Sequence, residues 1–394
     1  MAERTFLHVG TPKSGTTYLQ YVLWKSARRK MKRHGMLLPG NRITHFMAAK
    51  GVTRRIDQQQ KSDMDPAEAW PRLARQVNAW DGQALICHEL FAPATRRQAA
   101  RAKAALRDTE VHLVLTARTL ARQIPAAWQQ QVKGGAGLRY DRFIERLRDG
   151  DPVRQRISTR VGKARWFWLT QDLADIADRW GADIPPERIH IVTVPADASD
   201  PTLLWRRYAS VFGLEHVDID SAAPMRNVSL GRVETELLRQ LNNARDMRFR
   251  GLGRQRWTRG LLAASILARR PDTSPIGLPE EIKGWVAERT EEMLDQVRTA
   301  GYHVVGDLDD MRANGRTTAG CDKVATPEEV AESCSWAIKE LAEYLEQLRD
   351  DSDDPAAMDP APAVGPDDGI PAILELIEHI RAVETGQPPR PAYG

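Results

Sequence analysis

The sequence has only three cysteines and no long apolar run. Cys87, Cys321 and Cys334 are odd in number and widely separated, which excludes a disulfide framework and a thiolate zinc site. The longest apolar stretches, such as residues 260–268, are far shorter than the ~18 residues of a membrane span. The N-terminus runs into an apolar stretch without room for a signal peptide. We therefore expect a cytoplasmic protein with no membrane anchor.

Neither sign of charge is in large excess. The 394 residues carry 57 Lys and Arg against 53 Asp and Glu, a net charge of +4. This mild basic excess suits anionic ligands but not a nucleic-acid partner. Residues 245–270 carry eight arginines and one acid. They form either a solvated helical surface or a basic rim that attracts an anionic ligand.

Short apolar runs alternate with segments of helical spacing. Strands are predicted at 5–9, 83–87, 111–116 and 189–194. Helices are predicted at 18–30, 66–80, 96–107, 118–131, 140–147, 166–180, 203–212, 233–243 and 279–299. Such alternation requires crossover connections and a parallel sheet. We predict an α/β fold in three layers, with about four or five parallel strands flanked by helices, and a helical second half.

Other segments are predicted without regular structure. Residues 35–40 are predicted to form a turn. Residues 42–60 are predicted to form a loop over the mouth of an active site. Within this loop, His45 is more typical of a structural hydrogen bond than of catalysis. After residue 227 no strand is expected.

The C-terminal part predicts a domain followed by a tail. Thr326 and Glu329 make a capping box at a helix start. Seven aspartates and four prolines in 350–369 predict a disordered acidic linker. Residues 370–384 predict an amphipathic helix that docks on the body of the protein or on another chain. The expected division is a domain at 1–349 with a core at 1–230 and a helical part at 231–349, the linker at 350–369, and a helix and tail at 370–394.

The most informative stretch is the loop of residues 10–17, between the first strand and the first helix. Gly10 and Gly15 allow a close approach of backbone to a ligand. N–H groups at the following helix start favour an anion. A nucleotide phosphate loop, G-x-x-x-x-G-K-[ST], has a lysine after its second glycine. Here that position is Thr16, and the lysine is Lys13.

The segment Pro-Lys-Ser-Gly-Thr-Thr resembles the 5′-phosphosulfate loop of bacterial-type P-loop sulfotransferases, which use 3′-phosphoadenosine 5′-phosphosulfate. The resemblance covers roughly residues 4–230. It implies that Lys13 contacts the phosphosulfate near the bond that breaks, and that the hydroxyls of Thr16 and Thr17 cradle the 5′-phosphate. The donor-binding residues carried over with this loop are Pro12, Lys13, Ser14, Gly15, Thr16 and Thr17.

The general base is expected after the second predicted strand. Some sulfotransferases have a histidine there, and others have a glutamate. Here both occur, as His88 and Glu89. We favour Glu89 because the following Leu-Phe-Ala resembles the glutamate branch, and His88 is the second candidate. Adjacent residues on a strand point to opposite faces, and no metal-binding cluster is visible, so no metal cofactor is predicted.

Arg118 matches the arginine that binds the 3′-phosphate in the same family. The family has a serine eight residues later, where this chain has Ala126. No serine occurs at 119–130, so the substitute would be Thr119, Arg122 or Gln123. Further along, Asn227 and Ser229 resemble a segment that lies near the donor in bacterial relatives.

The predicted function is transfer of a sulfuryl group to a hydroxyl or amine of a small-molecule or glycan acceptor. The acceptor itself has no readable motif. A second hypothesis is a phosphate-loop kinase that uses ATP and magnesium, against which stands Thr16 in the lysine position. A third is a non-catalytic nucleotide-binding or scaffolding protein, suggested by Ala126 and by the tail helix.

Overall fold

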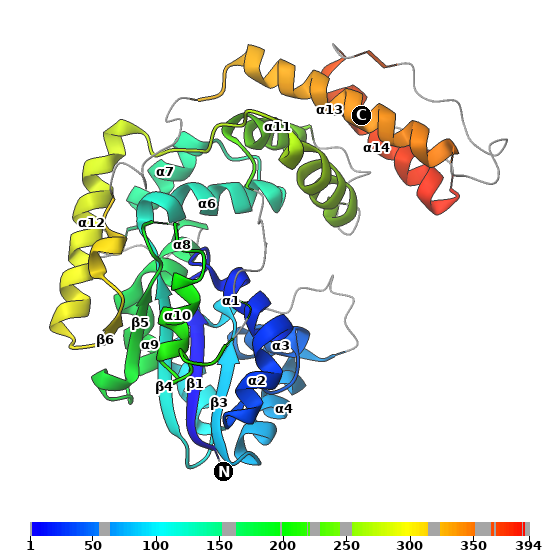
Figure 1. Cartoon of the computed structure of the whole chain (residues 1–394). Coiled ribbons are helices and arrows are strands. Elements are labelled where there is room, and N and C mark those ends of the chain that lie inside the picture. Colours follow the sequence, from blue (N-terminus) through cyan, green and yellow to red (C-terminus); the bar gives the residue numbers. More distant parts are fainter. Residues whose placement is uncertain are drawn as a thin grey trace. The chain divides into compact units, whose positions relative to one another are not determined.

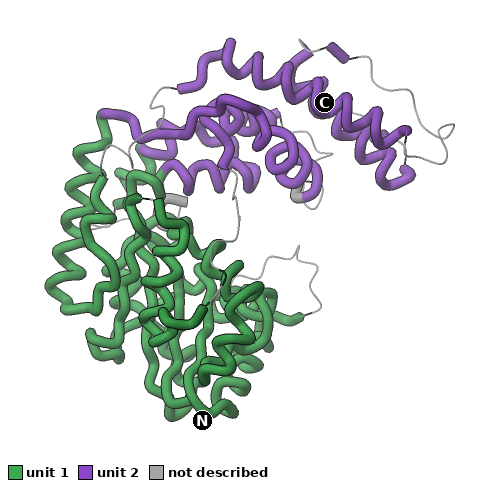
Figure 2. Tube along the Cα trace, in the orientation of Figure 1, with its two compact units in different colours: residues 1–124, 145–226, 281–318 green, residues 125–144, 227–280, 319–394 purple. Residues whose placement is uncertain are grey.

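The computed structural model describes residues 2–54, 64–151, 163–197, 199–218, 220, 229–244, 254–313, 324–350, 364–365, 368–387 and 389–390. The chain forms two compact units, neither of them continuous in sequence (Figure 2). Unit 1 comprises residues 1–124, 145–226 and 281–318, and unit 2 comprises 125–144, 227–280 and 319–394. Three of the borders fall within helices, namely within α6 (Leu120–Lys133), within α7 (Tyr140–Asp149) and after the first residue of α12 (Glu280–Thr299).

Unit 1 is built on a six-stranded parallel sheet, with the order β2-β3-β1-β4-β5-β6 (Figure 1). The strands are β1 (Ala2–Gly10), β2 (Met36–Leu37), β3 (Gly82–Cys87), β4 (Glu110–Ala117), β5 (Ile189–Thr193) and β6 (His303–Val305). β1 lies inside the sheet, where Phe6 pairs with Leu85 of β3 and with His112 of β4. The predicted fold class is confirmed.

The two edge strands correct the sequence analysis. β2 lies in the segment predicted as a turn, and β6 lies in the half where no strand was expected. Both are very short, two and three residues, so neither can show the apolar alternation that identifies a strand. Their extended form depends on pairing with β3 and β5. The sheet therefore has six strands, not four or five.

One face of the sheet is covered by the helical stretch that follows β1 and by the helix that follows β5. These elements are α1 (Thr16–Val22), the π-helical η1 (Leu23–Ala27), α2 (Arg28–Arg33) and α10 (Leu203–Ser210). Their apolar side chains form one core with those of the strands. That core includes Phe6, Leu19, Leu23, Met31, Leu85, Val114, Val192, Trp205, Tyr208 and Phe212.

The other face carries α9 (Leu173–Gly181), which contacts β4, and α5 (Arg96–Ala104), which contacts α9. A Cβ atom on Gly181 would lie 2.4 Å from Ile189 Cδ1, so a larger residue there would displace the side chain of Ile189. With helices on both faces, the predicted three layers are present (Figure 1).

Most predicted helices are confirmed, with two corrections. The segment expected to be a loop at 42–60 begins with α3 (Arg42–Thr53), which packs against α4 (Pro66–Asn78); residues 55–63 lie outside the described part. Asn41 caps α3, since its side chain accepts a hydrogen bond from Thr44 N at 2.9 Å. The helix expected at 166–180 is interrupted. It consists of α8 (Lys163–Gln171) and α9, because Asp172 caps α9.

Unit 2 is helical among its described residues. α13 (Pro327–Asp350) contacts α11 (Arg232–Asn243), η5 (Arg254–Ile266) and α14 (Gly369–Thr385). The predicted capping box at the start of α13 is confirmed, because Glu329 N donates to Thr326 Oγ1 at 3.2 Å and Glu329 Oε2 accepts from Thr326 N at 2.8 Å. The elements not yet named are η2 (Glu89–Phe91), η3 (Pro186–Arg188), η6 (Leu267–Arg269) and η7 (Leu308–Met311).

The tail helix packs within the same chain. α14 lies against α13, and its fully buried Glu378 pairs with Arg381 and Arg390 at 2.8 Å. Self-association through residues 370–384 stays a prediction. The predicted linker at 350–369 lies largely outside the described residues. In the arginine-rich segment, Arg270 pairs with Glu234 at 2.7 Å, which favours a structural role there.

Several histidines of unit 1 are buried, and His8 and His45 are the two with the least exposure. Burial lowers the pKa of His8 to about 3 and that of His45 to about 4. His45 Nε2 donates to Pro39 O at 2.7 Å, and His45 Nδ1 accepts from Cys87 N at 3.1 Å. The hydroxyl of Tyr208 is hydrogen-bonded to His8 Nδ1 at 3.0 Å. His45 is thus a structural histidine, in line with the sequence analysis.

These histidines predict a loss of stability in acid. Above pH 6.5 they are neutral in both folded and unfolded chains, and stability does not depend on them. Below pH 6.5 only the unfolded chain binds their protons, so each lowers the free energy of unfolding by about 1.4 kcal/mol per pH unit until its folded pKa is reached. Urea unfolding between pH 7.5 and 5 measures this slope.

The matched variants are His45→Gln and His216→Gln. His216 is exposed. The His45 variant is expected to reduce the slope by about 1.4 kcal/mol per pH unit, and the His216 variant to leave it nearly unchanged. Equal slopes in wild type and in His45→Gln would contradict the prediction.

Candidate functional site

The loop of residues 10–17 connects β1 to α1 through two glycines with positive φ. Gly10 has φ +133° and Gly15, which precedes the first residue of α1, has φ +80°. A Cβ on Gly15 would lie 2.5 Å from Leu204 Cδ2 of α10. The backbone N–H of Leu19 donates to Gly15 O at 3.0 Å and starts the helix. A side chain at Gly15 would therefore strain the backbone and displace the side chain of Leu204.

Thr116, near the end of β4, forms hydrogen bonds with three residues of this loop. Thr11 donates to Thr116 O twice, from its backbone N at 3.0 Å and from Oγ1 at 3.1 Å. Thr116 Oγ1 in turn donates to Gly10 O at 3.2 Å and is hydrogen-bonded to Ser14 Oγ. Thr11, Ser14 and Thr116 are fully buried. The hydroxyl of Ser14 is thus used inside the protein, where it shapes the loop.

Two glutamine side chains also donate hydrogen bonds to the loop. Gln123 Nε2 of α6 donates to Thr11 Oγ1 at 2.9 Å, and Gln171 Nε2 of α8 donates to Pro12 O at 3.0 Å. Gln123 was one of three suggested substitutes for the missing serine. A second, Thr119, accepts from Ala121 N at the start of α6. The role of Gln171 has no local signal in the sequence, because it lies 159 residues from Pro12.

Arg118 follows β4 and lies against the loop. Its Nη1 donates to the backbone O of Lys13 at 3.1 Å. In the described part of the chain no carboxylate pairs with this guanidinium. Burial, together with the charge of Arg122, lowers the pKa of Arg118 to about 10, so it still carries its charge at neutral pH. A partly buried cation without a carboxylate partner loses part of its hydration, and an anionic ligand at this place would offset that cost.

His88 and Glu89 follow β3 in a tight turn. His88 Nδ1 accepts a hydrogen bond from Leu90 N at 3.1 Å, which places the ring proton of the neutral histidine on Nε2. Burial lowers the pKa of His88. The partly buried Glu89 accepts at Oε2 from Gln20 Nε2 of α1 at 3.2 Å. Because its Nδ1 lone pair is occupied, His88 is poorly prepared to accept a proton.

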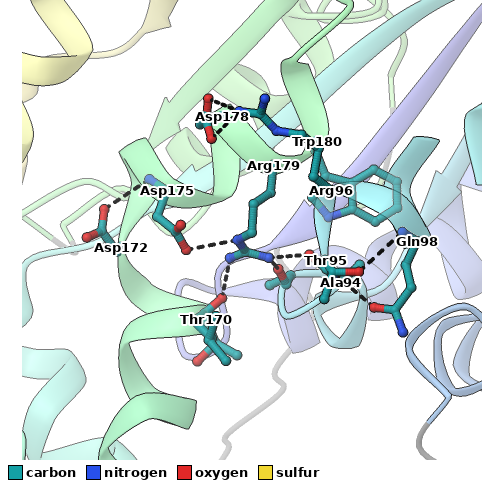
Figure 3. A network of polar contacts seen from close by, with 12 residues as sticks. Ala94, Thr95, Arg96, Gln98, Thr170, Asp172, Asp175, Asp178, Arg179 and Trp180 are labelled. Atoms are coloured by element: carbon teal, nitrogen blue, oxygen red, sulfur yellow. Dashed lines mark hydrogen bonds and ion pairs between the residues drawn. The ribbon is translucent and has the colours of Figure 1, made fainter. Parts of the chain in front are cut away.

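The segment after this turn is clamped by α9. Arg179 is 9% exposed and donates to Ala92 O at 2.7 Å. It also donates to Ala94 O (Figure 3). The next residue, Trp180, donates from Nε1 to Phe91 O at 3.1 Å. Buried hydrogen bonds to three successive parts of this segment fix its backbone, and with it the position of the Glu89 turn.

Lys13, Glu89 and Arg118 thus come from the carboxyl ends of three neighbouring strands, β1, β3 and β4. The loop and the Glu89 turn are close, since a Cβ on Gly10 would lie 3.5 Å from Glu89 O. Lys13 is partly buried with φ +67°. This edge of a parallel α/β sheet is where ligands usually bind.

The remaining predicted residues are placed as follows. Thr16 is 3% exposed and Thr17 is partly exposed, both in the first turn of α1. Asn227 lies outside the described residues. Ser229 belongs to unit 2 and is exposed. The participation of Asn227 and Ser229 stays a prediction.

Two searches concern the described residues only. No group of three or more His, Cys, Asp or Glu side chains there could hold a metal ion. Nor does that part of the chain contain a helix with the length and apolarity to cross a membrane.

A scan against protein-family models finds no match for this chain, and a search of curated proteins finds none. Among solved structures, the chain is similar to the crystal structure of a sulfotransferase from Alicyclobacillus acidocaldarius. The two share 17% sequence identity with a TM-score of 0.35, over 62% of this chain and 94% of that chain. A likeness of this size does not place the chain in a family.

Proposed function

We propose that this protein is a sulfotransferase that moves a sulfuryl group from 3′-phosphoadenosine 5′-phosphosulfate to a hydroxyl or amine of a small-molecule or glycan acceptor. The observation that carries the proposal is the partly buried Arg118 guanidinium, which has no carboxylate partner among the described residues and lies against the backbone of Lys13. Two cations at a glycine-containing loop that opens a helix suit a ligand with several phosphate charges.

In this proposal the donor's 5′ end lies in the 10–17 loop. The loop N–H groups, with Thr16 and Thr17, bind the 5′-phosphate, and Arg118 binds the 3′-phosphate. Lys13 stabilises the negative charge that develops on the phosphate oxygen as the sulfur–oxygen bond breaks. The hydrogen bonds from Thr116, Gln123 and Gln171 hold the loop in shape before the donor arrives.

Glu89 is the proposed general base. The acceptor oxygen or nitrogen forms a bond to sulfur, its proton passes to the Glu89 carboxylate, and the sulfur–oxygen bond to the phosphate breaks. The amide of Gln20, which donates to Glu89 Oε2 at 3.2 Å, orients this carboxylate. The occupied Nδ1 of His88 supports the choice of Glu89.

Nucleotide binding tests the donor assignment. Titration calorimetry is expected to show tighter binding of adenosine 3′,5′-bisphosphate than of adenosine 5′-phosphate. Arg118→Met is expected to weaken the bisphosphate by about 10–100-fold, the usual range for a lost hydrogen bond to a charged group, and the monophosphate much less. Arg75→Met, which alters an exposed arginine of α4, is the matched control. Equal losses for both nucleotides would place Arg118 at the 5′ end of the ligand.

Sulfuryl transfer tests the activity itself. The wild-type protein, incubated with sulfur-labelled donor and a panel of hydroxyl and amine acceptors, is expected to release labelled product without added magnesium. Tight binding of the bisphosphate with no transfer to any acceptor would support a non-catalytic protein instead. Magnesium-dependent turnover of ATP would support the kinase hypothesis.

A further inference from the structure

A cationic pocket lies beside α5 in unit 1. It has a volume of about 210 Å³ and is lined by Arg54, Thr95, Arg97, Gln98 and Arg101. The lining therefore contains three guanidinium groups and no carboxylate. Arg54 comes from the end of α3, and the other four come from the start of α5 and the residue before it.

The three arginines differ from their neighbours. Nη2 of Arg96 donates to both carboxylate oxygens of Asp178 at 2.6 Å, and Arg179 pairs with Asp175 at 2.9 Å (Figure 3). By contrast, no hydrogen bond or ion pair joins the side chains of Arg54, Arg97 or Arg101 to a described residue.

Bringing these arginines together has a cost. Arg97 and Arg101 are four residues apart on one helix, a spacing at which like charges are destabilising. Arg54 adds a third positive charge from another helix. An anion in the pocket would turn these repulsions into attractions, and the planar guanidinium fork matches the oxygens of sulfate, phosphate or carboxylate.

The N-terminus of α5 adds to the positive electrostatic potential at the pocket. Thr95 and Gln98 form a capping box: Gln98 N donates to Thr95 Oγ1 at 3.3 Å, and Thr95 N donates to Gln98 Oε1 at 2.8 Å. The positive end of the helix dipole therefore points toward the same pocket lining.

The pocket lies on the same edge of the sheet as the proposed base. β3 ends at Cys87, Glu89 follows in the turn, and α5 begins at Arg96. The few residues between turn and helix are clamped by Arg179. In the chain, the pocket residue Thr95 thus follows Glu89 by six residues.

We propose that this pocket binds an anionic group of the acceptor, a sulfate, phosphate or carboxylate, and so selects acidic acceptors. The selection of an acceptor rests on the proposed function, whereas the binding of an anion does not. To separate anion binding at the pocket from binding at the donor site, the affinity of the pocket is measured with the donor site filled by nucleotide. Protein saturated with adenosine 3′,5′-bisphosphate is titrated with inorganic pyrophosphate, and a parallel titration omits the nucleotide.

Wild type is expected to bind pyrophosphate with the nucleotide present. The variant R54Q/R97Q/R101Q is expected to lose at least about tenfold in affinity, which corresponds to one lost charged hydrogen bond. The control R72Q/R75Q/R107Q removes the same charge from exposed arginines elsewhere in unit 1 and is expected to bind like wild type. Equal affinity for pyrophosphate in both triple variants would contradict the proposal that this pocket binds an anion. Failure of the bisphosphate to bind would overturn the proposed donor site and leave the pyrophosphate result standing.

Transfer kinetics test selection. With two acceptors that differ only in one acidic group, R54Q/R97Q/R101Q is expected to raise KM about tenfold or more for the acidic acceptor, with kcat retained and KM for the neutral acceptor unchanged. Equal changes for both acceptors would contradict selection by this pocket.

Discussion

Replacing Lys13 by alanine is expected to lower kcat for sulfuryl transfer by about 10²–10³-fold, the range found when one preorganised donor to a developing oxyanion is removed. Lys13 lies in the loop between two glycines with positive φ, and its own backbone O accepts from Arg118. Its position is thus set by the loop. Because the leaving phosphate oxygen gains charge only as the bond breaks, the loss should appear in kcat more than in donor binding.

Two variants accompany this measurement. Lys25→Ala alters an exposed lysine of η1 and is expected to keep wild-type turnover. Lys13→Arg keeps the charge and is expected to retain part of the activity. Binding of adenosine 3′,5′-bisphosphate, measured by calorimetry, verifies that the Lys13→Ala loop is intact. If Lys13→Ala kept wild-type turnover, Lys13 would have no role in the chemical step.

Replacing Glu89 by glutamine is expected to lower kcat by about 10²–10⁴-fold, the usual contribution of a general base. The amide has nearly the same size as the carboxylate, and its oxygen can still accept from Gln20, so the turn should keep its form. The amide cannot accept the acceptor's proton. Donor binding is expected to change little, since Glu89 faces the acceptor in this mechanism.

His88→Asn is the matched control. Asparagine also accepts a hydrogen bond from the N–H two residues later and is a favourable residue before a helical turn, so the contact to Leu90 N is retained. We expect its kcat to stay within a few-fold of wild type. A larger loss in His88→Asn than in Glu89→Gln would assign the base to His88.

The regular parts of the fold were predictable because their patterns are local. The capping box of Thr326 and Glu329 needs only residues three apart. β2 and β6 could not be predicted, since a strand of two or three residues shows no alternation and depends on its neighbour for hydrogen bonds. α3 was missed because its apolar periodicity is weak.

The candidate site also has a part that could be predicted from the sequence and a part that could not. Lys13, Glu89 and Arg118 could be chosen from the sequence, because each follows a recognisable strand. The contacts that position them could not. Thr116 lies 105 residues from Thr11, and Gln171 lies farther still from Pro12.

The sequence by itself determined the loop of residues 10–17, the alternation of strands and helices, and the set of candidate side chains, because backbone preference and apolar spacing act over a few residues. Only the tertiary structure decided that Arg118 is partly buried without a carboxylate partner among the described residues, that Nδ1 of His88 is occupied, and that three arginines share one pocket. Burial and charge pairing depend on residues that are close in space but distant in the chain.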